Sequence, residues 1–271
     1  MKNLINTVIN RQKAFFKTRN TFDISKRKHL LKKLRDEIRL NEKEIETALF
    51  NDLGKSEGES YLTEIHFVYS ELKIAINNID KWTKRKSIRS SLLNFPSSDY
   101  IIAQPYGVTL HISPWNYPFQ LSIAPLVGAI AAGNTVVLKP SEYSKNTSLI
   151  LEKIITAVFD EDLVKVVKGG PEIASELLNH QWDYIFFTGS VNIGKIVAKQ
   201  AAINLTPTTL ELGGKNPCIV DETASIKVTA KRIVWGKFIN CGQTCIAPDF
   251  LIVNKKIKSK LITEIKNQII N

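Results

Sequence analysis

One cysteine near the C-terminal end of the sequence has the surroundings of a catalytic nucleophile. Cys245 lies in the stretch Asn240–Pro248, which reads Asn-Cys-Gly-Gln-Thr-Cys-Ile-Ala-Pro. A free thiol has a pKa of about 8.5, so a catalytic cysteine needs a site that stabilises its thiolate, and backbone N–H groups in a tight turn can do so. The alternative interpretation is that Cys241 and Cys245 are small buried hydrophobic side chains. Other parts of the chain must decide between the two.

Polar residues that suit an oxyanion and a nucleotide follow two predicted strands. Asn116 lies between Pro114 and Pro118, which restrain the loop, and its amide could donate a hydrogen bond to an oxyanion. Its alternative role is to cap the following helix. Lys139 and Glu142 together could bind the hydroxyls of a ribose, and the alternative is a surface turn with an ion pair. Both loops are candidate parts of a site.

A glycine-serine turn and a glutamate complete the set of candidate groups. The turn at Gly189 and Ser190 opens a predicted helix whose N-terminus could receive a phosphate. Ser190 is also an ordinary N-cap residue, and the G-x-G-x-x-G fingerprint is absent. Glu211 lies between two leucines at a predicted strand end, where partial burial would raise its pKa towards the range of a general base. The alternative is a glutamate that is paired structurally or exposed.

Short apolar runs alternate with segments long enough for crossover helices in the part of the chain that carries these groups. The runs are Val108–Ile112, Thr135–Leu138, Val164–Val167 and Tyr184–Phe187. Such runs are typical of buried parallel strands, and their alternation with helices predicts a doubly wound α/β sheet with ligands at the carboxyl ends of the strands. The candidate groups follow the predicted strands, as such a site requires.

The part of the chain before residue 90 predicts helices. Apolar residues recur at helical spacing in two stretches: Leu31, Leu34, Ile38, Ile45 and Leu49, and then Ile65, Tyr69, Leu72, Ile76 and Ile79. The segment 51–55 contains turn residues and separates the two stretches. Residues 87–98 are rich in Ser, Asn and Pro and predict a connecting segment or a short hairpin.

The composition is that of a globular protein with a basic surface. The chain has 271 residues, 44% of them hydrophobic, and a net charge of +11. Basic runs such as 26–28 and 84–86 lie among glutamates on predicted helices, which is more typical of a solvated face than of a nucleic-acid groove. We therefore expect no nucleic-acid partner. We also expect a cytoplasmic protein, because no apolar run reaches the roughly 18 residues of a membrane span and the N-terminus lacks a signal-peptide core. The odd number of cysteines indicates reduced thiols.

In their order and spacing, these motifs resemble those of the aldehyde dehydrogenase superfamily. The matching strings are Pro114-Trp115-Asn116-Tyr117-Pro118, Lys139-Pro140-Ser141-Glu142, Phe187-Thr188-Gly189-Ser190, Leu210-Glu211-Leu212-Gly213-Gly214-Lys215 and Gly242-Gln243-Thr244-Cys245. Two further strings, 127–134 and 235–238, are most similar to the class 3 branch, which acts on aromatic and medium- to long-chain aliphatic aldehydes. The resemblance covers essentially the whole chain.

The resemblance implies NAD(P)-dependent oxidation of an aldehyde to a carboxylic acid. It makes Cys245 the nucleophile that adds to the aldehyde carbonyl, and it makes the amide of Asn116 and the backbone N–H of Cys245 the donors to the oxyanion. It makes Glu211 the residue that activates water to hydrolyse the resulting thioester. The small-molecule partner is then an aldehyde, and full-length members of the family form homodimers.

The resemblance also assigns cofactor binding to residues of three loops: Pro114, Trp115, Lys139, Glu142, Gly189, Ser190 and Gly194. Lys139 and Glu142 match positions at the adenosine ribose, and the glycines with Ser190 match the turn at the pyrophosphate. A glutamate at position 142 opposes an added 2′-phosphate, so we expect NAD, with NADP as the alternative because class 3 enzymes often use either. No metal site is expected, since Cys241 and Cys245 with no nearby histidine do not supply four ligands.

Finally, the resemblance implies an incomplete second domain. Residues 1–209 match the N-terminal helices and a Rossmann-like NAD(P)-binding domain, whereas residues 210–271 match only the first part of an α/β catalytic domain. Family members are considerably longer and continue into a Glu-x-Phe-Gly-Pro motif and the strands of an oligomerisation arm. We therefore expect a fragment of an aldehyde dehydrogenase. The alternative is a truncated, catalytically inactive nucleotide-binding or interaction module, or one half of a split enzyme.

Overall fold

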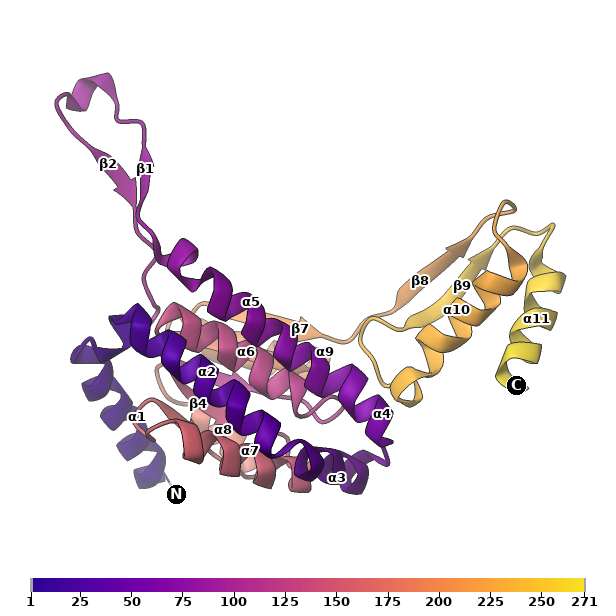
Figure 1. Ribbon diagram of the computed structural model, residues 1–271, viewed down its shortest axis with the longest axis horizontal. Helices are drawn as coiled ribbons and strands as arrows, with labels where there is room; N and C mark the ends of the chain where they lie inside the picture. Colours follow the sequence, from indigo (N-terminus) through magenta and orange to yellow (C-terminus); the bar gives the residue numbers. More distant parts are fainter. Residues whose placement is uncertain (1, 271) are drawn as a thin grey trace. The chain divides into compact units, whose positions relative to one another are not determined.

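The computed structural model describes residues 2–270, which divide into two compact units (Figure 1). Unit 1 runs to Thr188 and resumes over Asn192–Glu211, and unit 2 comprises Gly189–Val191 and the residues from Leu212 onward. Each unit has its own arrangement of helices and strands, so each is described by itself.

Helices make up the N-terminal part of unit 1, as the apolar spacing predicts. They are α1 (Lys2–Lys17), α2 (Ile24–Leu40), α3 (Glu42–Leu53), α4 (Glu57–Ser60), a π-helical turn (Tyr61–Ile65) and α5 (His66–Thr83). Asp23 caps α2 by accepting hydrogen bonds from the backbone N–H groups of Ser25 and Lys26. The predicted stripe is buried, with Leu31, Leu34 and Ile38 fully inaccessible to solvent. One face of each helix therefore supplies the core.

A two-stranded hairpin follows the helices and confirms one of the two alternatives for residues 87–98. Strands β1 (Lys86–Ile88) and β2 (Asp99–Ile101) pair antiparallel. The hairpin leaves the helical layer of unit 1 (Figure 1). Its tip exposes Leu92, Leu93 and Phe95, each more than four-fifths accessible to solvent.

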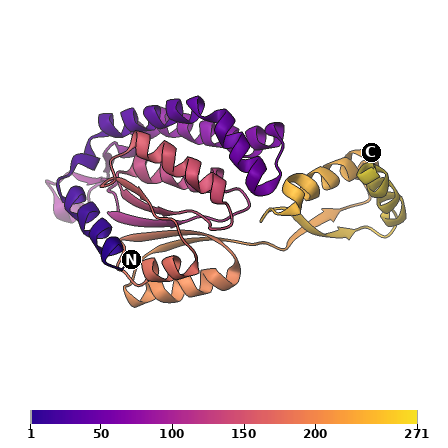
Figure 2. The same cartoon turned by 90° about the horizontal axis from the view of Figure 1, so that it is seen from below.

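A five-stranded sheet lies at the centre of unit 1, with order β5-β4-β3-β6-β7. The strands are β3 (Val108–Ile112), β4 (Thr135–Lys139), β5 (Val164–Val166), β6 (Tyr184–Gly189) and β7 (Thr208–Leu212). The helices that connect them are α6 (Gln120–Ala132), α7 (Lys145–Val158), α8 (Pro171–Leu178) and α9 (Val191–Ile203). Figure 2 shows helices on both faces of the sheet. The predicted doubly wound α/β fold is confirmed, and each predicted strand lies within about two residues of its observed bounds.

The strand order places several loops at one edge of the sheet. β3 pairs parallel with β4 on one side and with β6 on the other, so the chain reverses its direction of winding at β3. In register, Ile112 lies opposite both Lys139 and Phe187. The loops that leave β3, β4 and β6 therefore begin side by side, at the switch point where doubly wound sheets bind ligands.

Unit 2 is a small α/β layer. Strands β8 (Asn216–Val220) and β9 (Pro248–Val253) pair parallel, and helices α10 (Ile226–Phe238) and α11 (Lys258–Ile270) pack together. Its core contains Val220, Ala230, Ile233 and Leu261. The two strands leave large apolar side chains exposed: Ile219 is 74% and Ile252 is 51% accessible.

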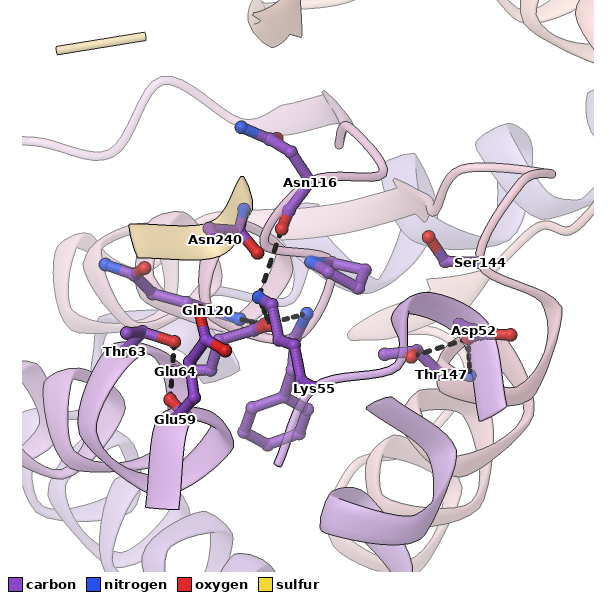
Figure 3. Close-up of polar contacts among 12 residues, drawn as sticks. Asp52, Lys55, Glu59, Thr63, Glu64, Asn116, Gln120, Ser144, Thr147 and Asn240 are labelled. Carbon is purple, nitrogen blue, oxygen red and sulfur yellow. Dashed lines mark hydrogen bonds and ion pairs between the residues drawn. The ribbon is translucent and has the colours of Figure 1, made fainter. Parts of the chain in front are cut away.

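The carboxylate of Asp52 joins the end of α3 to the start of α7. It accepts hydrogen bonds from Asn146, through the backbone N–H at 3.0 Å and the side-chain amide at 2.8 Å. It also accepts hydrogen bonds from Thr147, through the backbone N–H at 2.7 Å and the hydroxyl at 2.8 Å (Figure 3). Helix α7 has no side-chain cap from its own N-cap residue, Ser144. Asp52 therefore satisfies N–H groups that the helix itself leaves open, and its negative charge suits a helix N-terminus.

We expect Asp52→Ala to lower the free energy of unfolding by about 2 kcal/mol, because it removes a charged cap. Asp36→Ala is the matched control, since Asp36 pairs with Arg35 and its side chain is 57% exposed. That control should cost less than about 0.5 kcal/mol. Denaturant titration of both variants checks the prediction, and equal losses would contradict it.

Candidate functional site

The loop after β3 carries Asn116 and leads directly into α6. The helix begins at Gln120 with Phe119 at its N-cap, so the alternative role of Asn116 as the helix cap is wrong. The backbone carbonyl of Asn116 accepts a hydrogen bond from Lys55 Nζ at 3.1 Å. Its half-buried side chain points away from Lys55 (Figure 3). The loop backbone is thus held while the amide is presented on its other side.

The loop after β4 is fastened to the loop after β3. The backbone N–H of Ser113 donates to the carbonyl of Lys139 at 3.1 Å, and Ser144 Oγ donates to the carbonyl of Trp115 at 3.2 Å. Pro114 lies between these two attachments and is half-buried, whereas Trp115 is 41% exposed. The two loops form one surface at the carboxyl edge of the sheet.

Lys139 and Glu142 form an ion pair, with Nζ and Oε2 2.5 Å apart. Lys139 is buried, so the pair is not a simple surface turn. Burial by itself raises the pKa of Glu142, but the hydrogen bond from Lys139, the residue's own backbone N–H and the lysine charge outweigh it and lower that pKa. Glu142 is therefore a carboxylate at neutral pH and can accept hydrogen bonds from hydroxyl groups.

The turn after β6 opens α9, as the sequence predicts. Gly189 is the last residue of β6, and α9 begins at Val191. Ser190, between them, is exposed, and Gly194 is buried within the helix. The backbone N–H groups of the first turn of a helix favour a negatively charged ligand.

Glu211 lies near the end of β7, and one expectation about it is wrong. The strand spans Thr208–Leu212, so its predicted position at a strand end is confirmed. Its side chain is exposed rather than partly buried. The reason is that β7 is the last strand in the sheet order and Glu211 alternates outward between two half-buried leucines.

Cys245 lies in unit 2 and is exposed, as is Cys241, so the interpretation of these cysteines as buried hydrophobic side chains is wrong. The turn before Cys245 is left-handed: φ is 53° at Asn240, 54° at Cys241 and 77° at Gly242. Left-handed backbone costs a residue with a Cβ roughly 1–2 kcal/mol. The three cysteines, including Cys218, are free thiols, as predicted.

Asn216 holds the Cys245 segment in place, and sequence reasoning assigned no role to it. Its side-chain Nδ2 donates to the carbonyl of Cys245 at 2.7 Å and to that of Ala247 at 3.2 Å. Gly214 lies against the same carbonyl, where a Cβ would collide with the oxygen of Cys245. The only signal in the sequence is that both residues belong to the Gly-Gly-Lys-Asn turn between two strands.

The structure brings the predicted residues together in two groups. Asn116, Lys139 and Glu142 lie on the joined loops of unit 1, which also contains Glu211. Cys245 belongs to unit 2, to which Gly189 and Ser190 are also assigned. Lys55, Glu64 and Asn216 contact these segments and carried no functional signal in the sequence.

Residues 2–270 contain neither a metal-binding cluster nor a membrane-spanning helix. No group of three or more His, Cys, Asp or Glu side chains in this range is placed to hold a metal ion. No helix in the same range is long and apolar enough to cross a membrane.

Comparison with known proteins gives one consistent family. Residues 2–270 match the aldehyde dehydrogenase family. The chain is 49% identical to 4,4'-diaponeurosporen-aldehyde dehydrogenase of Staphylococcus aureus over 96% of its length and 57% of that protein. It is 44% identical to aldehyde dehydrogenase family 3 member B3 of Mus musculus, covering 96% of this chain and 54% of the relative. The chain spans about half the length of these curated relatives.

Solved structures agree with the sequence comparison. The structure described as the substrate bound state of Staphylococcus aureus AldH superposes with a TM-score of 0.95 and 48% identity, covering 98% of this chain and 58% of that one. Two more distant structures, each 25% identical and covering 98% of this chain, contain nicotinamide cofactors. One, P. syringae AldA (TM-score 0.90, 55% of its chain), is a complex with NAD+, and the other, GapN of Methanocaldococcus jannaschii (TM-score 0.89, 58%), is a complex with NADP.

Substitutions at two adjacent glycines, Gly213 and Gly214, test how the chain packs against the backbone of Cys245. We expect Gly214→Ala to displace the segment and to destabilise unit 2 by about 1–3 kcal/mol, because the added methyl overlaps a backbone carbonyl. Gly213→Ala is the matched control, since nothing lies within 4 Å of a Cβ there. Amide hydrogen exchange over residues 243–248 checks this, and exchange that is accelerated equally in both variants would contradict it.

Because the pKa of Glu142 is lowered in the folded protein, we expect its ion pair with Lys139 to contribute to the loss of stability at acidic pH. Because the folded-state pKa lies below the ordinary value of 4.5, the ion pair stabilises the protein above that pH and is lost as pH falls through the folded pKa. We expect the free energy of unfolding of Glu142→Gln to fall less steeply below about pH 4.5 than that of the wild type. Denaturant titrations across this range provide the test, and parallel pH profiles would refute the assignment.

Proposed function

Because the chain belongs to the aldehyde dehydrogenase family, we propose that the protein it represents oxidises an aldehyde to a carboxylic acid, with Cys245 as nucleophile. The observation that carries this proposal is the family match over residues 2–270. The presence of the nucleophile, oxyanion-donor and base residues at the family's motif positions supports it. The activity, the substrate and the partners are proposals for the whole protein, since the chain spans about half of its relatives' length.

In the proposed reaction the Cys245 thiolate adds to the aldehyde carbonyl and gives a tetrahedral adduct with a negatively charged oxygen. The amide of Asn116 and the backbone N–H of Cys245 donate hydrogen bonds to that oxygen. Each donor of this kind contributes on the order of 3 kcal/mol to transition-state stabilisation. The hydrogen bond from Asn216 to the carbonyl of Cys245 supports this role, because it limits movement of the backbone beside the nucleophile.

The second half of the reaction releases the acid. Nicotinamide, when bound, would supply the acceptor for the hydride that leaves the aldehyde carbon, and the Cys245 adduct would then be a thioester. Glu211 then removes a proton from water, which attacks the thioester carbonyl, and the carboxylic acid leaves as the Cys245 thiolate is regenerated. The position of Glu211 near the end of β7, within the family's motif, supports this role.

Residues at the carboxyl edge of the sheet fit a nicotinamide dinucleotide. We assign the adenosine ribose to Lys139 and Glu142, whose ionised carboxylate accepts from two hydroxyls but repels a 2′-phosphate. We assign the pyrophosphate to Gly189, Ser190, Gly194 and the start of α9. Pro114 and Trp115 complete the set from the loop after β3. This arrangement favours NAD over NADP.

The domain organisation and assembly are proposed on the same basis. Residues 1–209 form the N-terminal helices and nucleotide-binding domain, and residues 210–271 form the first part of the catalytic domain. The relatives' greater length and the exposed apolar face of β8 and β9 support this division. We propose that the whole protein forms a homodimer.

The nucleophile assignment is tested by two cysteine variants. We expect Cys245→Ser to lose at least about 1000-fold in kcat, because a serine hydroxyl is hardly ionised at neutral pH. Cys241→Ser, a neighbouring exposed thiol, should retain the wild-type rate. The assay follows NADH formation from benzaldehyde or hexanal, with NAD and NADP affinities measured by calorimetry on the same samples. Wild-type turnover in Cys245→Ser would overturn the assignment.

The same experiment separates a second candidate function. Because the chain spans about half of its relatives' length, the alternative is a nucleotide-binding module without turnover, or one half of a split enzyme. Nucleotide binding without NADH formation by the 271-residue chain would favour that alternative. Turnover that appears only after a separately produced C-terminal half is added would identify a split enzyme.

A further inference from the structure

A buried ion pair lies directly behind the loop that carries Asn116. Lys55 Nζ and Glu64 Oε1 are 2.5 Å apart, and their side chains are 2% and 0% exposed. Charged side chains are almost never this deeply buried without a partner. Neither residue belongs to the motifs at the sheet edge, and neither has a role in the proposed chemical steps.

Local structure explains how the two residues reach this position. Gly54, at φ 67°, ends α3, and Ser56 caps α4, so Lys55 lies in the short link between them. Glu64 lies in the π-helical turn Tyr61–Ile65 that joins α4 to α5. A π-helical turn widens the helix, and Thr63, Glu64 and Ile65 are all buried in succession. Such turns are frequent at functional sites.

The two side chains form hydrogen bonds with both ends of the Asn116 loop. At one end, Lys55 Nζ donates to the carbonyl of Asn116 at 3.1 Å and lies 4.2 Å from the centre of the Tyr117 ring. At the other end, Glu64 Oε2 accepts from the backbone N–H groups of Phe119 at 2.8 Å and Gln120 at 3.1 Å (Figure 3).

Glu64 also replaces a missing helix cap. Phe119, the N-cap residue of α6, provides no side-chain cap, so the first N–H groups of that helix depend on Glu64. A carboxylate at a helix N-terminus is favoured by the helix dipole as well as by its hydrogen bonds. The start of α6 and the carbonyl of Asn116 are therefore fixed relative to the same two charges.

We propose that Lys55 and Glu64 are positioning residues that hold the Asn116 side chain in the orientation needed to stabilise the oxyanion. This inference rests on the proposed function, because it assigns the pair to the hydrogen-bond donor of that reaction. The amide of Asn116 points away from Lys55, so the pair acts on the backbone of the loop and not on the amide itself (Figure 3). Neither positioning residue touches the reacting atoms.

The principal test uses a double variant, Lys55→Met/Glu64→Leu. Replacing a buried ion pair with apolar side chains of similar size often preserves stability, whereas removing one partner leaves an unpaired buried charge. We expect this variant to fold and to lose about 10- to 100-fold in kcat and in kcat/KM alike, with KM for the aldehyde unchanged. A folded double variant with wild-type kcat would overturn the proposal.

The matched control is Arg27→Met. Arg27 lies on α2, and its buried charge contacts the C-terminal end of α6, opposite the end that Glu64 caps. Arg27 is 6% exposed, donates from its Nε to the carbonyl of Thr21, and donates to the carbonyl of Ala131 at 3.2 Å. It does not contact the Asn116 loop. We expect reduced thermal stability in this variant but a kcat within about 2-fold of the wild type for the folded protein. An equal loss of kcat in the control would show a general packing effect and refute the proposal.

A second measurement does not depend on activity. In the 271-residue chain, the amides of Phe119 and Gln120 should exchange at least about 10-fold faster in the double variant than in Arg27→Met, because they lose a charged acceptor. Unchanged exchange would overturn the inference even if aldehyde oxidation is confirmed. Absence of wild-type turnover with any aldehyde would instead count against the proposed function and leave this exchange test valid.

Discussion

The buried ion pair between Lys55 and Glu64 is the interaction on which the Asn116 loop depends. Burial raises the pKa of Glu64, and the charge of Lys55 with the N–H groups of Gln120 and Phe119 opposes that rise. Removing one partner of such a pair costs roughly 3–5 kcal/mol, because the other charge remains buried. The pair of Lys43 and Glu57, with side chains 77% and 75% accessible, is exposed to water and therefore contributes little to stability. The buried pair of Lys55 and Glu64 can therefore order a loop, whereas the exposed pair stabilises the protein too little to do so.

The parallel sheet imposes the second constraint. Because β3 pairs with β4 and β6 in register, the loops that follow these strands must begin at one edge. The hydrogen bonds from Ser113 to the carbonyl of Lys139 and from Ser144 to the carbonyl of Trp115 then join two of those loops. The ion pair of Lys55 and Glu64 fixes the same surface from the helical side. The sheet thus sets where the loops start, and buried polar contacts set how they continue.

In unit 2, a stretch of left-handed backbone and the side chain of Asn216 position the segment that carries Cys245. The left-handed backbone at Asn240 and Cys241 is unfavourable by itself, and it turns the chain just before Cys245. Asn216 compensates locally by bonding the carbonyls of Cys245 and Ala247, and Gly214 leaves room for one of them. Both units therefore hold the backbone of a proposed reactive segment through its carbonyl groups.

The sequence by itself determined the helices, the parallel strands and the motif residues, because apolar periodicity and turn residues act over short stretches of chain. It did not determine that Glu211 is exposed, since exposure depends on which strand ends the sheet. It also gave no sign that Lys55 meets Asn116, a residue 61 positions away. A lysine in a turn has the same local pattern whether water or a buried carboxylate surrounds it. Only the tertiary structure decided this, because the partner and the loss of solvent both come from distant segments.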